Sequence, residues 1–161
     1  MRSRRHQFLV GAVLVGLAVA GLDREGTSQG MSFEQTQLTL ITQSGRHQLV
    51  VDVATNTSQA EFGLRYRPSI NPDGGLLILQ ARAAPETISV NTDGISLPLD
   101  LLFVASDGTV MEVHPWIPTD SATPIVSNSP VGAALELAGG TVTRFGILPG
   151  DKVIGGGLGS I

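Results

Sequence analysis

The chain has 161 residues, of which 42% are hydrophobic, and a formal net charge of −4 at pH 7. This length predicts one domain, and the hydrophobic content is ordinary for a globular protein. The sequence contains no cysteine, which excludes thiolate metal sites, thiol redox chemistry and lipid attachment through a cysteine. The excess of acidic residues disfavours nucleic acid and anionic membrane surfaces as partners.

The N-terminal residues have the pattern of a bacterial export signal. Residues 1–7 carry three arginines, residues 8–22 are apolar without interruption, and the small residues at 18–20 suit a signal peptidase. We expect cleavage after Ala20, a location in the periplasm or outside the cell, and no stable membrane insertion of the mature chain. The alternative is an uncleaved N-terminal anchor, because the apolar run is only slightly shorter than the roughly 20 residues of a membrane span.

The remaining chain divides into three parts by composition. Residues 21–31 are polar and contain glycine, so we expect a linker. A single β-rich domain is expected at residues 32–154, followed by a flexible glycine-rich tail at residues 155–161. Removal of residues 1–20 leaves 10 − 3 = 7 basic against 14 acidic residues, a net charge of −7.

Two β-hairpins are expected from alternating or apolar runs that flank glycine-containing turns. The turns are Ser44-Gly45 and Asp107-Gly108, and for the second we predict a type I′ turn at the centre of the domain, since Asp-Gly tolerates positive φ. The paired runs are residues 37–42 with 46–54, and residues 99–106 with 109–115.

Two short helices are also expected. Ser58 and Glu61 have the spacing of a capping box, with the helix continuing to Tyr66, and a second helix at residues 141–145 is stopped by Gly146. Other short apolar runs are bounded by glycine, proline or asparagine and predict a mostly β fold, a jelly-roll-like sandwich or partly open barrel. These runs are residues 76–79, 87–90, 125–127 and 133–137.

Several of these segments, taken in order, resemble the exported proteins of the family called domain of unknown function 192, over about residues 49–153. The run LPLDLLFV at residues 97–104 carries the most specific part of this resemblance. The resemblance implies a compact, β-rich, jelly-roll-like domain with a short helix packed on it, and no established activity. The other matching segments are residues 63–67 and 69, 72–78, 107–108, 113–114, 134–137, 145–147 and 150–153.

The chain departs from the family's pattern in two places. Asn91, Thr92 and Asp93 stand where the family usually has tryptophan, methionine and a basic residue, and Phe62 and Arg65 stand where it has arginine and methionine. One reversed charge beside one gained arginine predicts a compensating ion pair between Asp93 and Arg65. The alternative is an anion site whose ligand Asp93 repels.

Three side chains form the candidate polar cluster: Arg67, Asp100 and His114. Asp100 lies in an apolar strand and needs a partner, for which Arg65 and Arg67 are the candidates, either as a structural clamp or in a ligand pocket. His114 shares a strand face with Glu112, which makes them expected neighbours. We expect no metal site, because too few donors have ligand spacing, and no cofactor.

The function expected from this sequence is a non-catalytic envelope module that binds an unidentified ligand or envelope protein. No nucleophile elbow or triad pattern is present, and no catalytic residue is assigned. The alternative is an enzyme or enzyme remnant that acts on a small envelope substrate, with Asp100 and His114 as acid–base groups and Arg67 orienting an anion. Convergence of these three side chains on one pocket would favour the alternative. A third hypothesis, an accessory domain in an assembly, predicts a large exposed apolar patch.

Overall fold

A computed structural model describes residues 30–80 and 85–159. The predicted signal peptide and nearly all of the predicted linker lie outside the described residues. Within the described residues, no helix is both long enough and apolar enough to cross a membrane. The elements are β1 (Glu34–Thr42), β2 (Gly45–Ala54), α1 (Thr57–Phe62), β3 (Gly74–Leu79), β4 (Ser89–Val90), β5 (Leu99–Val104), β6 (Val110–Ile117), β7 (Ile125–Val126), β8 (Ala133–Ala138), α2 (Thr141–Phe145) and β9 (Lys152–Ile154).

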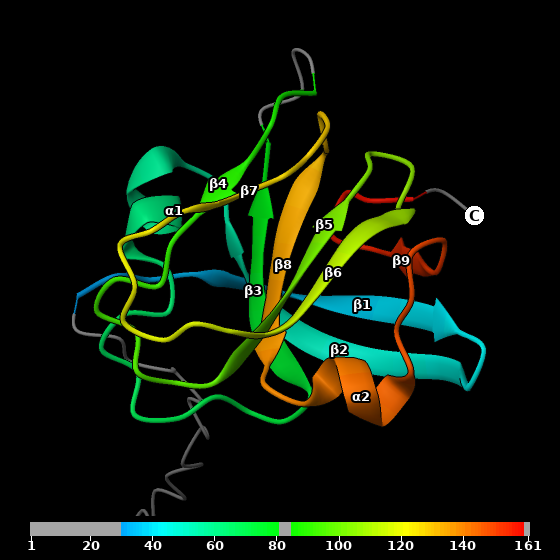
Figure 1. Ribbon diagram of the computed structural model, residues 1–161, viewed down its shortest axis with the longest axis horizontal. Coiled ribbons are helices and arrows are strands. Elements are labelled where there is room, and N and C mark those ends of the chain that lie inside the picture. Colours follow the sequence, from blue (N-terminus) through cyan, green and yellow to red (C-terminus); the bar gives the residue numbers. More distant parts are fainter. Residues whose placement is uncertain (1–29, 81–84, 160–161) are drawn as a thin grey trace, which may run out of the picture.

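Seven strands form one strongly curled sheet in the order β6-β5-β8-β3-β2-β1-β9, and β4 pairs with β7 separately (Figure 1). Only β2 and β3 are parallel neighbours in the large sheet, and α1 lies in the connection between them. The two edges of the sheet meet, because Val110 N–H donates to Asp151 O (2.8 Å) and Val153 N–H donates to Gly108 O (2.7 Å). The prediction of a mostly β, partly open barrel with two short helices is confirmed.

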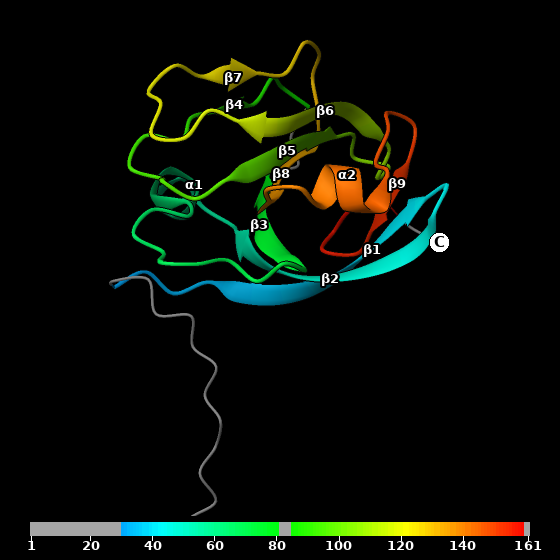
Figure 2. The ribbon, with the colours of Figure 1, turned by 60° about the horizontal axis from the view of Figure 1, so that its bottom comes forward.

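The sheet is covered on both faces, and each face has its own apolar cluster. The inner face is the concave side, where β1, β2 and β9 curl back toward β5 and β8 (Figure 2). The outer face is covered by α1, by the chain that follows it, and by the β4–β7 pair. As a result, every residue of β5 is buried, and five of the six residues of β8 are buried. Polar side chains at these positions are therefore cut off from water on either face.

Both predicted hairpins are present. In the first, Thr42 of β1 pairs with Gly45 of β2. In the second, Ala105 N–H donates to Thr109 O (2.8 Å) and, of the two turn residues, only Gly108 has positive φ (84°). The type I′ turn was therefore a wrong prediction: the loop is a type I turn followed by a left-handed glycine. The hairpin also lies at the edge of the sheet rather than at its centre, because β6 is the outermost strand.

The two helices differ in how well the sequence predicts them. α2 and its left-handed cap Gly146 (φ 63°) are confirmed. In α1 the N-cap is Asn56, whose Oδ1 accepts from Gln59 N–H (2.9 Å), so the predicted cap at Ser58 is wrong. α1 also ends at Phe62 rather than near Tyr66, because Gly63 (φ 55°) turns the chain away.

The glycine-rich C-terminal segment also differs from the predicted tail. Gly155 and Leu158 exchange two backbone hydrogen bonds of 3.0 Å, and Leu158 is only 3% exposed within the inner apolar cluster. The described residues of this segment therefore complete the core instead of leaving it.

Candidate functional site

A row of cross-strand neighbours runs across the outer face of the sheet. Asp52 of β2 pairs with Leu76 of β3, Leu76 with Glu136 of β8, Glu136 with Leu101 of β5, and Leu101 with His114 of β6. Cross-strand partners point to the same side of a sheet, so all five side chains face the outer layer. The row therefore places three ionisable groups beneath α1 and the β4–β7 pair.

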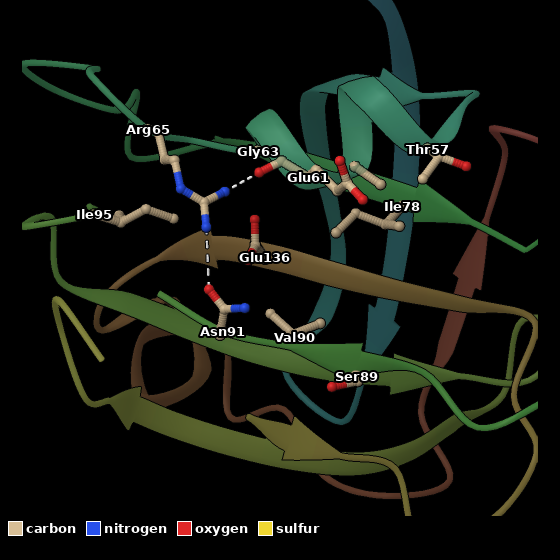
Figure 3. A pocket seen from close by; sticks show the side chains of 11 residues that line it. Thr57, Glu61, Gly63, Arg65, Ile78, Ser89, Val90, Asn91, Ile95 and Glu136 are labelled. Atoms are coloured by element: carbon tan, nitrogen blue, oxygen red, sulfur yellow. Dashed lines mark hydrogen bonds between the residues drawn. The ribbon is translucent and has the colours of Figure 1, made fainter. Parts of the chain in front are cut away.

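A cavity of about 200 Å³ lies between this face and the outer layer; we call it the Glu136 cavity (Figure 3). Glu136 comes up from β8 between Arg65 and Asn91 on one side and the apolar Ile78 and Val90 on the other. The lining is thus mixed, with one wall able to hydrogen-bond and the other apolar. The complete set of lining residues is Thr57, Ala60, Glu61, Gly63, Arg65, Ile78, Ser89, Val90, Asn91, Ile95 and Glu136.

Glu136 is the unusual residue of this cavity. It is 2% exposed, and its Oε2 has no hydrogen-bond partner among the described residues. Burial raises the pKa of its carboxyl to about 7, although the nearby charges of Arg65 and Arg67 lower it. Near neutral pH the group is therefore divided between acid and carboxylate, and in both forms it has hydrogen-bonding capacity that the protein does not use.

Arg65 spans one side of the cavity. Its Nη1 donates to the backbone oxygens of Glu61 and Phe62, and its Nη2 donates to Oδ1 of Asn91 (3.1 Å; Figure 3). These bonds tie the end of α1 to the chain that leaves β4. Within the described ranges no carboxylate forms an ion pair with Arg65, so its guanidinium and the carboxyl of Glu136 line the same cavity without a direct bond.

Arg67 lies near Glu136 but is neutralised by another residue. Its Nη2 is 2.6 Å from Oδ2 of Asp52, and its guanidinium lies over the ring of Phe33 at 5.4 Å. Asp52 also accepts a hydrogen bond from Nε2 of Gln35 (3.0 Å). Nε and Nη2 of Arg67 are buried without a well-aligned hydrogen bond in the described part of the chain. Arg67 is therefore committed to an ion pair with Asp52, and the predicted pair with Asp100 is wrong.

Asp100 lies on the inner face, opposite to Glu136. It is 0% exposed, and it pairs in register with Leu137, which belongs to the inner cluster. Its Oδ1 accepts from Trp116 N–H (2.9 Å) and its Oδ2 accepts from Val142 N–H (2.7 Å) at the start of α2. The partners of Asp100 are two backbone amides instead of an arginine. Its role is that of a clamp that joins β6 and α2 to β5.

His114 and Glu112 are neighbours, as the sequence predicts. His114 Nε2 is 3.2 Å from Glu112 Oε2, and the imidazole meets the ring of Phe103 edge-on at 5.5 Å. Glu112 also accepts from the backbone N–H (2.7 Å) and from Nδ2 (2.9 Å) of Asn128. This cluster fastens β6 to the loop that follows β7, and it lies outside the lining of the Glu136 cavity.

The candidate cluster of Arg67, Asp100 and His114 does not form. Asp100 and His114 lie on opposite faces of the sheet, and none of the three lines the Glu136 cavity. Glu136 was not among the predicted site residues, although its sequence context carries a signal. Glu136 is the single charged residue in the apolar run of β8, as Asp100 is in β5.

Two of the five family-departure positions, Arg65 and Asn91, meet at the cavity, but the predicted ion pair does not form. Arg65 bonds to Asn91, and among the described residues no ion pair joins it to the exposed Asp93. Thr92 is buried, and its hydroxyl donates to Pro118 O (2.5 Å). Phe62 packs against the rings of Phe33 and Tyr66, at centroid distances of 6.5 and 5.8 Å.

Other chemistry-bearing pairs are structural. Ser44 Oγ is 2.8 Å from His47 Nε2 and donates to Phe145 O (2.7 Å). Since a hydroxyl has one proton, the histidine donates to the serine and does not act as its base. In residues 30–80 and 85–159, no group of three or more histidine, cysteine, aspartate or glutamate side chains is placed to hold a metal ion.

Comparison with known proteins gives a family and a fold. The family model of domain of unknown function 192, described as "Uncharacterized ACR, COG1430", matches residues 39–155. A crystal structure of a "putative transcription regulator" from Sinorhizobium meliloti 1021 is 40% identical, with a TM-score of 0.75, and the match covers 80% of this chain and 98% of that one. A protein of unknown function from Novosphingobium aromaticivorans DSM 12444 is 28% identical, with a TM-score of 0.73 and coverage of 79% and 89%. No curated protein matches. The chain belongs to the family domain of unknown function 192.

Proposed function

We propose that this protein is an exported, non-catalytic binding module that holds a small molecule in the Glu136 cavity. The observation that carries the proposal is the buried carboxyl of Glu136, whose Oε2 has no hydrogen-bond partner in the part of the chain that the structure describes. An isolated buried carboxyl destabilises a fold, and an apolar residue of similar size would remove that cost. A ligand that donates a hydrogen bond to this carboxyl would offset the cost of burying it.

The surrounding residues support binding better than catalysis. The buried carboxylate of Asp100 is held by two backbone amides, and Glu112 holds His114 and Asn128. Neither Asp100 nor the Glu112–His114 pair lines the Glu136 cavity, and among the described residues no histidine, lysine or tyrosine lines it that could complete an acid–base pair with Glu136. The net charge of −4 argues against nucleic acid, the partner that the description of the S. meliloti neighbour would suggest.

The proposal that the protein is exported rests on the N-terminal pattern of three arginines followed by an apolar run. We expect the mature chain to begin at Gly21. Mass spectrometry of protein recovered from the periplasm or medium tests this, and intact residues 1–20 on membrane-bound protein would contradict it.

Ligand binding is tested by a thermal-shift screen of the purified protein against sugars, peptides, metal ions and anions of the cell envelope. A ligand present at 100 times its Kd stabilises the native state by about 2.7 kcal/mol, which raises Tm by several degrees. Chemical-shift mapping then locates the ligand, and we expect shifts at residues that line the cavity.

Two variants separate cavity binding from other binding. Glu136→Gln should weaken the ligand, and Glu34→Gln, which changes an exposed glutamate of β1, should leave it unchanged. A ligand whose shifts map away from the cavity and whose affinity is the same in both variants would contradict the proposed function.

A further inference from the structure

We propose that the Glu136 cavity selects small uncharged molecules, through a polar group that donates a hydrogen bond to Glu136 and accepts one from Arg65. This inference rests on the proposed function and specifies its ligand class. A primary amide or a hydroxyl on a short hydrocarbon has the required chemistry.

Charge balance favours an uncharged ligand. The charged residues that line the cavity are Glu61, Arg65 and Glu136, and of these the Glu61 side chain is exposed to solvent. The remaining two carry opposite charges that cancel when Glu136 is ionised. An anion would then add an unbalanced negative charge beside Glu136, and a cation would add a positive one beside Arg65. A neutral molecule leaves the pair balanced.

The free hydrogen-bonding groups of Arg65 and Glu136 also suit an uncharged polar group. A guanidinium has five N–H donors. Three acceptors hold Arg65, namely the backbone oxygens of Glu61 and Phe62 and the side chain of Asn91, so donors remain for a ligand. No donor in residues 30–80 or 85–159 bonds to Oε2 of Glu136. A ligand group placed between the two side chains must therefore accept on one side and donate on the other.

The rest of the lining suits a short hydrocarbon. Ile78, Val90 and Ile95 give the cavity its apolar wall. A volume of about 200 Å³ has room for a molecule of several heavy atoms, and would hold only part of a peptide or an oligosaccharide. The ligand is thus small, with one polar end and one apolar end.

Binding of this ligand should depend on the protonation of Glu136. A ligand donor bonds more strongly to a carboxylate than to the neutral acid. Because burial raises the pKa of Glu136 to about 7, acidification below neutral pH removes the stronger acceptor. The charged or titratable groups around Glu136 come from all the packed elements. Glu61 of α1 and Arg65 line the cavity with it, the charge of Arg67 acts on it, and Asp52 of β2 and His114 of β6 lie in the same cross-strand row.

The direct test uses three probes of nearly equal size and different charge: propionamide, propionate and propylammonium. Each is titrated into the isotope-labelled full chain at pH 5.5 and pH 8.5, and chemical shifts of the cavity residues are followed. We expect propionamide to bind most tightly. Because the pKa of Glu136 is about 7, its ionised fraction rises from about 3% to about 97% between these pH values. The affinity for propionamide should therefore rise up to about thirtyfold. In Glu136→Gln the affinity for propionamide should be independent of pH.

The outcomes separate this inference from the proposed function. Tightest binding of propionate, with an affinity that rises on acidification, would overturn the uncharged-ligand inference and leave the cavity as a binding site for anions. Tightest binding of propylammonium would also overturn the uncharged-ligand inference, and would leave the cavity as a binding site for cations. Absence of saturable shifts at the cavity for all three probes, together with no stabilising ligand in the broader screen, would overturn the proposed function itself. The wild-type pH comparison keeps the test valid even if Glu136→Gln folds poorly.

Discussion

Asp100 and Glu136 are buried carboxyls on neighbouring strands, one register position apart, and they have opposite surroundings. Asp100 faces the inner core, and each of its oxygens accepts a backbone N–H. Glu136 faces the outer layer, and its Oε2 has no partner in the described residues. A buried carboxyl thus holds the fold together on one face of the sheet, and on the other face a buried carboxyl remains able to bind a ligand.

The difference comes from what packs on each face. On the inner side, α2 begins directly against β5, so an orphan amide of its first turn reaches the carboxylate of Asp100. On the outer side, α1 ends at Phe62, and the chain that follows bonds to itself and to Asn91 instead of to Glu136. A satisfied buried carboxylate indicates a structural clamp, and an unsatisfied one beside a cavity indicates a candidate site.

The largest expected effect is at the satisfied carboxylate. Asp100→Ala removes two charge-assisted hydrogen bonds and leaves the amides of Trp116 and Val142 buried without acceptors. Such bonds contribute about 1.5–3 kcal/mol each, so the free energy of unfolding should fall by about 3–6 kcal/mol. Urea unfolding measures this, with Asp93→Ala as the exposed control. A loss below about 1 kcal/mol, the size of an ordinary surface change, would remove Asp100 from its clamp role.

A smaller effect is expected at Glu136, where the ionised carboxyl destabilises the fold instead of stabilising it. In the folded protein this carboxyl is more stable as the neutral acid. Its pKa is raised from 4.5 to about 7, so the folded state holds its proton more tightly than the unfolded state does. Stability should therefore fall as the pH rises through this window, by about 2–3 kcal/mol between pH 5 and pH 8. Glu136→Gln should lack this fall when both proteins are unfolded in urea. Equal pH profiles in the two proteins would show that the carboxyl is not perturbed.

The smallest expected effect concerns the wall of the cavity. Asn56→Ala removes the side-chain cap of α1 and should lower the free energy of unfolding by about 1 kcal/mol. Ser58→Ala is the matched control, since Ser58 lies two residues further on and is exposed. Its effect should stay within about 0.5 kcal/mol. Urea unfolding that ranks the two variants in the reverse order would place the cap at Ser58.

The sequence predicts much of the fold because local patterns specify it. Alternation and turn residues are sufficient for the β1–β2 and β5–β6 pairings, and Gly146 marks the end of α2. Turn type and helix caps are predicted less well. Asp107 and Ser58 each satisfy a common motif, but in the structure Asp107 accepts from Thr109 N–H and Asn56 caps α1.

The candidate site is harder to predict, because it depends on contacts between distant segments. Asp100 bonds to Val142, 42 residues later, and Arg65 bonds to Asn91, 26 residues later. The sequence shows that the acidic residues of β5 and β8 each stand in an apolar run, which indicates burial. It does not show which of the two has its partners supplied by the opposite layer, and this is what separates the clamp from the site.

The proposed binding site depends on Glu136 being a buried carboxyl whose Oε2 has no hydrogen-bond partner among the described residues. A carbon-13 NMR titration of the Glu136 side-chain carboxyl in the ligand-free protein tests it most directly. We predict a midpoint at about pH 7, because burial raises the pKa of this group, with Glu34 serving as an exposed reference in the same spectra. A midpoint near 4.5, the ordinary value for glutamate, would mean that the carboxyl is solvated or hydrogen-bonded by the protein, and it would contradict the account.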